Sequence, residues 1–223
     1  MRIVRTRRGL RLVEGDVILS ELLARPGPTH CLFDVLAACV HALAPGPRVA
    51  LLGFAGGGMI APLRAMGFPH AIEAVDLDST GEVLFRELAG EWAGTVRVAR
   101  MDALEWLAAE REPFDLIVED LSVNGPDGTV KPRASFAALP PLVRRRLRPL
   151  GVAVTNLLPQ RGAAWDALIG PVARPHERAS VIELSEHENR IVVCGAVPED
   201  VEGRIRRALD AIGSVQARKI SVR

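Results

Sequence analysis

Residues 53–58 read GFAGGG and directly follow the apolar run VALL at residues 49–52. Glycines in such a turn let backbone N–H groups approach a ligand without a Cβ in the way, and the helix that follows offers the positive end of its dipole. The same kind of turn also serves plain packing of a strand against a helix. We expect four residues of the turn to bind a cofactor: Gly53, Ala55, Gly56 and Gly57.

The chain beyond this turn alternates between strand-like and helical patterns. Runs typical of buried strands lie at 49–52, 71–77, 95–99, 114–119 and 152–157, and helical patterns lie at 59–66, 79–88, 102–110 and 135–147. This alternation predicts right-handed βαβ units on a mostly parallel sheet that is covered by helices on both faces.

The end of the chain follows a different pattern. Two strand-like runs, 180–184 and 190–196, are joined by a polar segment at 185–189, and a terminal helix is expected over 199–212. A hairpin that closes a parallel sheet is typical of the seven-stranded sheet of methyltransferase-like proteins and unusual for a dinucleotide dehydrogenase. We therefore predict an α/β, Rossmann-like fold with a seven-stranded, mostly parallel sheet and a C-terminal β-hairpin.

The beginning of the chain predicts a small antiparallel β unit. Its expected parts are three short strands at 2–6, 10–14 and 17–19, with turns at 7–9 and at Gly15-Asp16. Arg25-Pro26-Gly27-Pro28 is typical of a linker, and Thr29 of the N-cap of the next helix. We predict an N-terminal β-hairpin unit at residues 1–28 and a Rossmann-like domain at residues 29–223.

Acidic residues follow the second and third predicted strands, at the edge where ligands bind in open α/β sheets. Asp76 ends the second strand, 23 residues beyond Gly53, where a carboxylate can accept both ribose hydroxyls of a nucleoside. Asp102 follows the third strand and can accept from an adenine amino group, and it is equally suited to cap a helix. Both are candidate cofactor-binding residues.

The fourth predicted strand ends in Glu119-Asp120, and a loop containing glycine and proline follows at residues 122–134. A carboxylate at this edge can accept a proton from an attacking amine or orient the amine. An edge carboxylate paired with an arginine is the structural alternative. We select Asp120 as the candidate catalytic residue.

Composition narrows the classes of partner. The 223-residue chain has a formal net charge of +1 and a pI of about 7.8, so no overall field attracts nucleic acid or an anionic membrane. The N-terminus lacks the apolar segment of a signal peptide, and three cysteines without CxxC spacing argue against a disulfide framework. We expect a cytoplasmic protein without a metal, and we expect His176 and His187 to be solvated in connecting segments.

Taken in order, four motifs resemble those of the spermidine synthase (polyamine aminopropyltransferase) family, which has the class I S-adenosylmethionine-dependent methyltransferase fold. The motifs lie at 53–58, 75–78, 101–107 and 114–120, within a resemblance that extends over about residues 2–160. The resemblance implies S-adenosylmethionine or decarboxylated S-adenosylmethionine as the cofactor. It places Asp76 at the ribose, Asp102 at the adenine and Asp120 at the amine acceptor, with residues 122–134 closing over the site.

Departures from the family pattern bear on the reaction. The family turn GGGDGG has an aspartate where this chain has Gly56. The family's Asp-Ser-Ser-Asp run is replaced here by Asp120-Leu121-Ser122-Val123, so the second acid is absent. The family also places a tyrosine in the diamine pocket, and this chain contains no tyrosine. Lys131 and Arg133 add positive charge to the covering loop. A diamine needs carboxylates to offset its desolvation, so these differences predict another kind of acceptor.

The change at Gly56 also bears on the donor. Intact S-adenosylmethionine has a carboxylate that its decarboxylated form lacks. Two like charges about 4 Å apart repel by about 4 kcal/mol at an effective dielectric constant near 20, so the loss of an aspartate favours the intact donor.

The leading prediction is therefore methyl transfer from S-adenosylmethionine to a small-molecule, non-diamine acceptor. The first alternative is an aminopropyltransferase in which Glu73, Glu119 or Asp127 replaces the missing acids. The second is a non-catalytic protein that binds a nucleoside or no ligand and acts through a dimer surface. A homodimer is expected in each case, because two or three short strands rarely stand alone and the N-terminal unit offers a contact.

Overall fold

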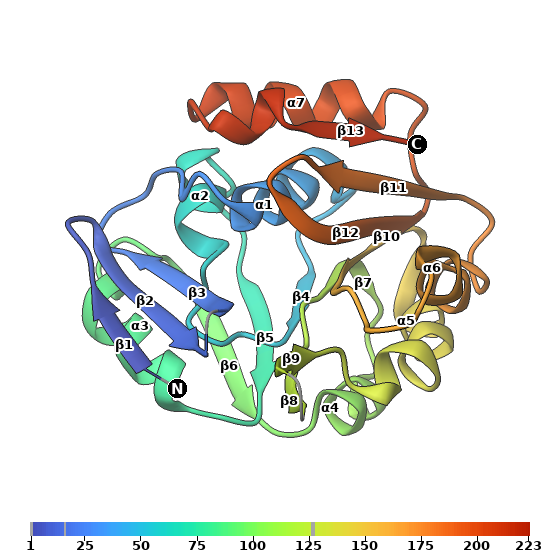
Figure 1. Ribbon diagram of the computed structural model, residues 1–223, viewed down its shortest axis with the longest axis horizontal. Helices are drawn as coiled ribbons and strands as arrows, with labels where there is room; N and C mark the ends of the chain where they lie inside the picture. Colours follow the sequence, from blue (N-terminus) through green and yellow to red (C-terminus); the bar gives the residue numbers. More distant parts are fainter. Residues whose placement is uncertain (1, 16, 126–127) are drawn as a thin grey trace.

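The computed structural model describes residues 2–15, 17–125 and 128–223. A large central sheet has helices on both faces, and a smaller N-terminal sheet lies beside it (Figure 1). The strands of the large sheet are β4 (Val49–Leu52), β5 (Ile72–Asp76), β6 (Val96–Arg100), β7 (Phe114–Glu119), β10 (Leu147–Leu157), β11 (Ala179–Leu184), β12 (His187–Gly195) and β13 (Ile220–Val222). Their order across the sheet is β13-β11-β12-β10-β7-β4-β5-β6.

Five of these strands, β6, β5, β4, β7 and β10, run parallel, as the alternation of strand and helix predicted. β12 pairs antiparallel with β10 and β11, and β13 adds an antiparallel edge next to β11. The predicted Rossmann-like fold with its C-terminal hairpin is confirmed, with one strand more than expected. β13 has three residues, which is too short for a strand period to show in the sequence.

The sheet separates two hydrophobic clusters, because alternate residues of a strand point to opposite faces. Val49 and Leu51 of β4 belong to one cluster, and Ala50 and Leu52 belong to the other. The first face is covered by α1 (Leu32–Leu43), α2 (Ile60–Ala65), α3 (Thr80–Ala89) and α7 (Val201–Ala211), and the second by α4 (Ala103–Ala109), α5 (Leu139–Arg146) and α6 (Trp165–Ala173). No helix within the described residues has the length and apolarity that a membrane span requires.

Helix α1 is buried over most of its surface because it lies between the sheet and α7 (Figure 1). It begins after Cys31, so the prediction of Thr29 as its N-cap is wrong. The backbone N–H and hydroxyl of Thr29 donate instead to Asp34 Oδ1, at 2.7 and 2.6 Å. Ser214, close to the C-terminus, donates to Asp34 Oδ2 at 2.5 Å, so this carboxylate joins the start of α1 to the end of the chain.

The N-terminal sheet consists of β1 (Arg2–Arg5), β2 (Gly9–Glu14) and β3 (Val17–Leu23), which pair antiparallel as predicted. β3 is longer than expected, and Asp16 of the predicted turn lies outside the described residues. The buried side chains of Leu12 and Leu22 join the hydrophobic cluster on the α1 side of the large sheet. The division of the chain at residue 28 stays a prediction.

Two connections differ from the expected ones. β11 and β12 are joined by Ser185-Glu186 alone, so His187 and Asn189 belong to a strand and not to a polar connection. The helix predicted over 135–147 is divided into a 3₁₀ turn, η1 (Arg133–Phe136), and α5. Pro140 lies in the first turn of α5, where a proline is tolerated, whereas a single longer helix would place it in the interior.

Candidate active site

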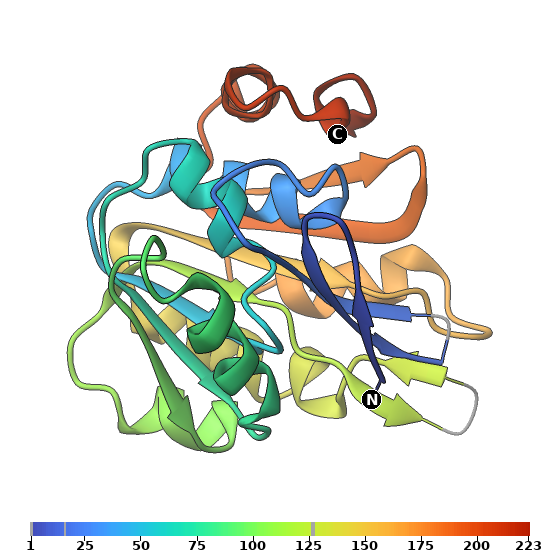
Figure 2. The same ribbon diagram turned by 90° about the vertical axis from the view of Figure 1, so that its left-hand side faces the viewer.

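A cavity of about 710 Å³ lies at the carboxyl ends of the parallel strands. It spans the junction of β4 and β7, where the order of the strands along the sheet reverses, which is where open α/β sheets bind ligands. Its outer walls come from the N-terminal sheet and from a hairpin formed by β8 (Val123–Gly125) and β9 (Gly128–Val130), which project side by side (Figure 2).

The glycine-rich turn enters this cavity through Gly53 and Ala55. Gly53 has a φ of +90°, and a Cβ on it would lie 2.7 Å from the backbone oxygen of Asp120. A glycine is therefore needed for the turn to pack against the end of β7. Ala55 has a φ of +46°, a left-handed conformation that glycine adopts more readily, which explains why glycine is usual at this place in the related motif.

Gly56 and Gly57, the other two predicted residues of the turn, are not among the residues that line the cavity. A Cβ on Gly56 would lie 2.5 Å from Leu22 Cδ1 and 3.0 Å from Leu12 Cδ1, both in the N-terminal sheet. A Cβ on Gly57 would lie 2.6 Å from the ring of Phe54. A side chain at position 56 would therefore meet the N-terminal sheet.

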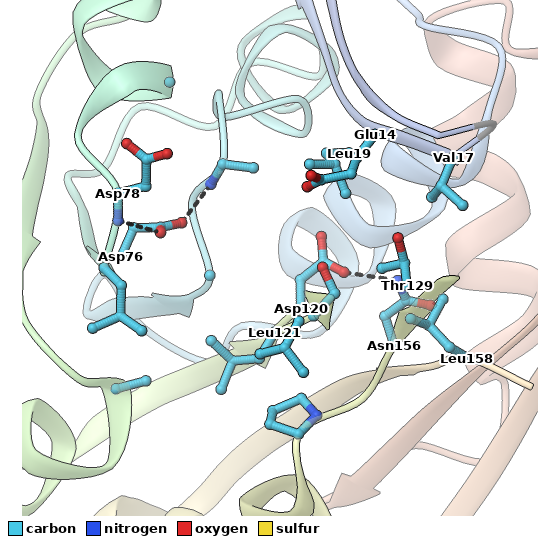
Figure 3. A pocket seen from close by; sticks show the side chains of 18 of the residues that line it. Glu14, Val17, Leu19, Asp76, Asp78, Asp120, Leu121, Thr129, Asn156 and Leu158 are labelled. Atoms are coloured by element: carbon cyan, nitrogen blue, oxygen red, sulfur yellow. Dashed lines mark hydrogen bonds between the residues drawn. The ribbon is translucent and has the colours of Figure 1, made fainter. Parts of the chain in front are cut away.

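Asp76, at the end of β5, lines the cavity and holds the glycine-rich turn in place. Its Oδ2 accepts from the backbone N–H groups of Phe54 and Ala55 at 2.8 and 2.7 Å, and its Oδ1 accepts from the N–H of Asp78 at 3.0 Å. Asp78 lies beside it in the same part of the cavity (Figure 3). Asp78 gives this end of the cavity a second carboxylate.

Asp102 follows β6, lines the cavity and caps α4. Its Oδ1 accepts from the backbone N–H groups of Leu104 and Glu105, at 2.8 and 3.1 Å. The capping role foreseen as an alternative is therefore present. It leaves Oδ2 for a ligand, so the two roles are compatible.

Asp120 lies just beyond β7, in the middle of the cavity lining (Figure 3). Its Oδ1 accepts from Asn156 Nδ2 at 2.7 Å. Burial raises the pKa of Asp120 to about 6, with smaller contributions in the same direction from Glu119 and Asp76, while the Asn156 amide and the Lys131 ammonium oppose the rise. Asp120 can therefore change between carboxylate and carboxylic acid near neutral pH.

Two asparagines of the site were not foreseen. Asn156 is in β10, and its Oδ1 accepts from Asn189 Nδ2 of β12 at 2.9 Å. Both line the cavity. The available signal was a polar residue at the end of the apolar run VAVTNLL, because a polar side chain at the carboxyl end of a buried strand faces the edge where ligands bind.

Glu119 and Lys131 form a buried ion pair outside the cavity lining. Lys131 Nζ donates to Glu119 Oε1 at 2.6 Å, and the two side chains are 1% and 4% exposed. Ser135 Oγ donates to the same oxygen at 3.1 Å. Contrary to the prediction, Lys131 is ion-paired and does not line the cavity, although its charge still lowers the pKa of Asp120. Arg133 is exposed and is not among the lining residues either.

Of the three acids suggested as replacements in an aminopropyltransferase, Glu119 and Glu73 are not placed to act as such. Glu119 forms an ion pair with Lys131. Glu73 lies toward the opposite end of β5 from Asp76 and pairs with Arg48 at 3.1 Å. Asp127 lies outside the described residues.

Glu14, at the end of β2, is an acidic residue of the cavity that the sequence motifs did not indicate. Its Oε1 accepts from Asn124 Nδ2 of the β8–β9 hairpin at 3.1 Å. Its carboxylate and that of Asp120 point toward the same part of the cavity (Figure 3). Five carboxylates line the cavity, and no lysine or arginine of the described chain does: the acids are Glu14, Asp76, Asp78, Asp102 and Asp120.

His176 and His187 are both half-buried and not fully solvated; His176 lies in a connecting segment, as predicted, whereas His187 belongs to β12. His187 lines the cavity, and burial lowers its pKa, an effect that Glu186 opposes and Lys219 reinforces. Burial, followed by the nearby Arg144, lowers the pKa of His176 to about 4. Both imidazoles are therefore neutral at pH 7. Within the described residues, no three His, Cys, Asp or Glu side chains are grouped as metal ligands would be.

Neither a protein-family model nor a curated protein matches the sequence. Among solved structures, human methyltransferase-like protein 13 in complex with SAH has a TM-score of 0.59 and 20% identity, over 84% of this chain and 90% of that one. A spermidine synthase in complex with the transition-state analogue AdoDATO has a TM-score of 0.62 and 10% identity, over 84% and 66%. A SAM-dependent methyltransferase from Agrobacterium tumefaciens has a TM-score of 0.54 and 15% identity, over 74% and 61%.

This chain thus spans most of the human protein but less than two thirds of the other two. At these identities the likeness concerns the fold. The chain has the Rossmann-like fold that S-adenosylmethionine-dependent methyltransferases share with spermidine synthases.

Proposed function

We propose that this protein is a transferase that uses S-adenosylmethionine to methylate a small acceptor carrying a single amine. The observation that carries the proposal is the charge of the cavity, in which five carboxylates are accompanied by no lysine or arginine among the described residues. A cation loses hydration when it enters such a site, and carboxylates offset that cost. The sulfonium of the donor and the ammonium of an amine acceptor are both cations. The shared fold supports the donor class.

The cavity residues that follow β4, β5 and β6 fit such a donor. Gly53 leaves the backbone of the turn open to the cavity. Asp76 and Asp78 offer two carboxylates to the two ribose hydroxyls, and Asp102 keeps Oδ2 for an adenine amino group. Each assignment rests on position and hydrogen-bonding capacity.

Two carboxylates flank the proposed acceptor position. Asp120 and Glu14 point toward the same part of the cavity (Figure 3), and apolar side chains of the N-terminal sheet and of the sheet edge surround them. Val123 lines the cavity where the related motif has a second acid. One ammonium with an apolar body suits this arrangement better than a second ammonium does.

Asp120 supplies the proton chemistry. When bound, the donor offers a methyl carbon that the positive sulfur activates. Before an amine can attack that carbon, its ammonium must lose a proton, and the Asp120 carboxylate accepts it to become a carboxylic acid. A pKa of about 6 keeps Asp120 ionised and ready to accept a proton at pH 7–8. Alignment of the two reactants within one cavity contributes the remaining acceleration.

A second reaction, aminopropyl transfer, is favoured by one specific observation. Lys131 is neutralised by Glu119, and Glu14 adds an acid that the sequence did not indicate, so the site is more anionic than expected. Decarboxylated S-adenosylmethionine lacks the carboxylate of the intact donor and would suit such a site. Position 56 does not decide between the two donors, because Gly56 packs against the N-terminal sheet and is not among the residues that line the cavity.

Thermal-shift titration with the intact and the decarboxylated donor tests the proposal. A single-site ligand at 100 times its Kd stabilises the folded state by about 2.7 kcal/mol, which gives a clear rise in Tm. We expect a larger rise with the intact donor, loss of that rise in Asp76→Ala, and an unchanged rise in the matched Asp210→Ala, whose side chain is exposed on α7.

Turnover is tested separately with a panel of monoamines and diamines and the donor that binds. Formation of the methylated monoamine and of the demethylated donor supports methyl transfer. Preference for the decarboxylated donor together with a diamine product would establish the second reaction instead. A failure of both donors to stabilise the protein would contradict both reactions and leave a fold without this chemistry.

A further inference from the structure

Three polar side chains form a hydrogen-bonded line across neighbouring strands of the sheet. Asn189 Nδ2 donates to Asn156 Oδ1 at 2.9 Å, and Asn156 Nδ2 donates to Asp120 Oδ1 at 2.7 Å. The line therefore runs from β12 through β10 to the end of β7. All three residues line the cavity.

The strand register brings these side chains together. Thr155 of β10 pairs with Glu119 of β7, and both line a separate small cavity beside α5 and α6. The next residue of each strand points to the opposite face, because side chains alternate along a strand, so Asn156 and Asp120 meet on the other side. Asn189 reaches them because the two-residue turn before β12 keeps it within the strand.

The outer asparagine fixes the direction of the inner amide. An asparagine side chain has an accepting oxygen at one end and a donating nitrogen at the other. When Asn189 donates to the oxygen of Asn156, the Asn156 nitrogen must face Asp120. The amide is therefore held in the orientation that favours an ionised Asp120 and disfavours a protonated one.

We propose that Asn156 and Asn189 are positioning residues that hold Asp120 as a carboxylate and direct its second oxygen into the cavity. The catalytic use of this carboxylate rests on the proposed function, whereas the orientation itself does not. Asn156 contacts Asp120 directly, and Asn189 acts on it through Asn156. The hydrogen bond from Asn156 lowers the pKa of Asp120 and so opposes the effect of burial, which raises it.

Other charged groups near Asp120 also affect its ionisation. Lys131 favours the carboxylate, and Glu119 and Asp76 disfavour it. Glu14 points toward the same part of the cavity from the N-terminal sheet, and His187 lines the cavity from β12. A test of the two asparagines must therefore separate the orientation of the amide from a general change of charge in the cavity.

Replacing Asn189 by aspartate makes that separation. In Asn189→Asp the outer residue becomes an acceptor, so the Asn156 amide turns its nitrogen outward and presents its oxygen to Asp120. A carboxylate facing that oxygen is repelled, whereas a carboxylic acid donates to it. Asn124→Asp is the matched control, because it makes the same chemical change in the lining of the same cavity but outside the line.

The experiment is a carbon-detected NMR titration of the Asp120 carboxyl group in the ligand-free protein. We expect a midpoint near pH 6 in the wild type and a midpoint at least one unit higher in Asn189→Asp, which is a tenfold change in the proton affinity of Asp120. Asn156→Ala, which removes the direct donor, is expected to raise the midpoint as well. Asn124→Asp is expected to raise it less than Asn189→Asp does.

A midpoint in Asn189→Asp no higher than in Asn124→Asp would overturn the proposal, and so would an unchanged midpoint in Asn156→Ala. If Asn189→Asp does not fold, as judged by its amide spectrum, Asn189→Ala replaces it, and an unchanged midpoint there is the contradicting result. Calorimetry with S-adenosylmethionine tests the proposed function separately, because it measures donor binding and not the ionisation of Asp120. If the midpoints shift as expected but S-adenosylmethionine does not bind, the positioning role of the two asparagines is supported and the proposed transferase function is refuted.

Discussion

At Asp120, burial and hydrogen bonding act in opposite directions on one carboxyl group. Burial raises its pKa to about 6, and the Asn156 amide limits the rise. A group with a raised pKa binds a proton in the folded state over a pH range in which the unfolded chain has released it. The free energy of unfolding therefore falls as the pH rises from about 4 to about 6 and then levels off.

Asp120→Asn is expected to separate stability from activity. The amide oxygen can still accept from Asn156, and the cost of a buried negative charge disappears. We expect the free energy of unfolding to rise by about 3 kcal/mol at pH 8 and by little at pH 4, while methyl transfer falls at least 100-fold. Urea unfolding at the two pH values and single-turnover kinetics measure the two effects.

Two results would contradict this prediction. One is an equal change in stability at both pH values, because the effect would then not come from ionisation. The other is unchanged turnover on a confirmed acceptor, which would remove Asp120 from the chemistry. Asp210→Asn, at an exposed position of α7, is the control and is expected to leave both quantities unchanged.

At the scale of single elements, the first turn of α3 and the glycine-rich turn are in close contact. A Cβ on Gly81 would lie 1.3 Å from the carbonyl oxygen of Ala55. Backbone atoms on both sides leave no flexible group to move aside. The turn that is proposed to hold the donor is therefore supported by a helix that follows the next strand.

Gly81→Ala is expected to displace the glycine-rich turn and to weaken donor binding at least tenfold, with a loss of stability. Gly170→Ala in α6 is the matched control, because a Cβ there meets no atom within 4 Å. Alanine in a helix is favoured over glycine by about 0.5–1 kcal/mol, so the control is expected to stabilise the protein. Calorimetry with the donor and thermal unfolding give the comparison. Unchanged donor affinity in Gly81→Ala would contradict the supporting role.

The buried pair of Glu119 and Lys131 links β7 to the segment that follows the β8–β9 hairpin. Lys131→Met would leave the Glu119 charge buried without its counter-ion, which costs about 3–5 kcal/mol. The double variant Glu119→Gln, Lys131→Met removes both charges and is expected to recover most of that loss. Chemical denaturation of the two variants measures this. A Lys131→Met protein as stable as the wild type would show that the pair is not structural.

The sequence allowed the parallel strands and the glycine-rich turn to be predicted because their signals are local. The buried strand, the turn GFAGGG and Asp76 lie within one short stretch of the sequence, so their pattern is visible without knowledge of the fold. Glu14 and Asn189 could not be found in this way, since each reaches the cavity only through the packing of a distant hairpin. Lys131 was misjudged for the same reason, because its charge is cancelled by Glu119, twelve residues earlier.

At the scale of the whole molecule, the N-terminal sheet packs on the glycine-rich turn with one face. Leu12 and Leu22 are buried against Gly56. The side chain of Ile3 in β1 remains exposed, at 47%, whereas the partly exposed Val17 and Ile18 line the cavity. β1 is an edge of this sheet and can pair with another strand.

We therefore propose that the protein is a homodimer joined through this sheet. Sedimentation equilibrium is expected to give twice the chain mass of 24.0 kDa. Ile3→Glu is expected to shift the protein to the monomer, whereas the control Val215→Glu, at a similarly exposed aliphatic residue, keeps the dimer. A wild-type monomer at micromolar concentration would refute the dimer.

The hydrogen bond between Glu14 and Asn124 joins residues that are 110 positions apart in the chain. During synthesis on a ribosome, at about 5–20 residues per second, Glu14 leaves the exit tunnel roughly 5–20 seconds before its partner. Until residues 53–58 have been synthesised, the apolar face of the N-terminal sheet has no turn to pack against. The cavity is therefore completed late in synthesis, because a chain that stalls before β8 lacks the wall that the β8–β9 hairpin provides.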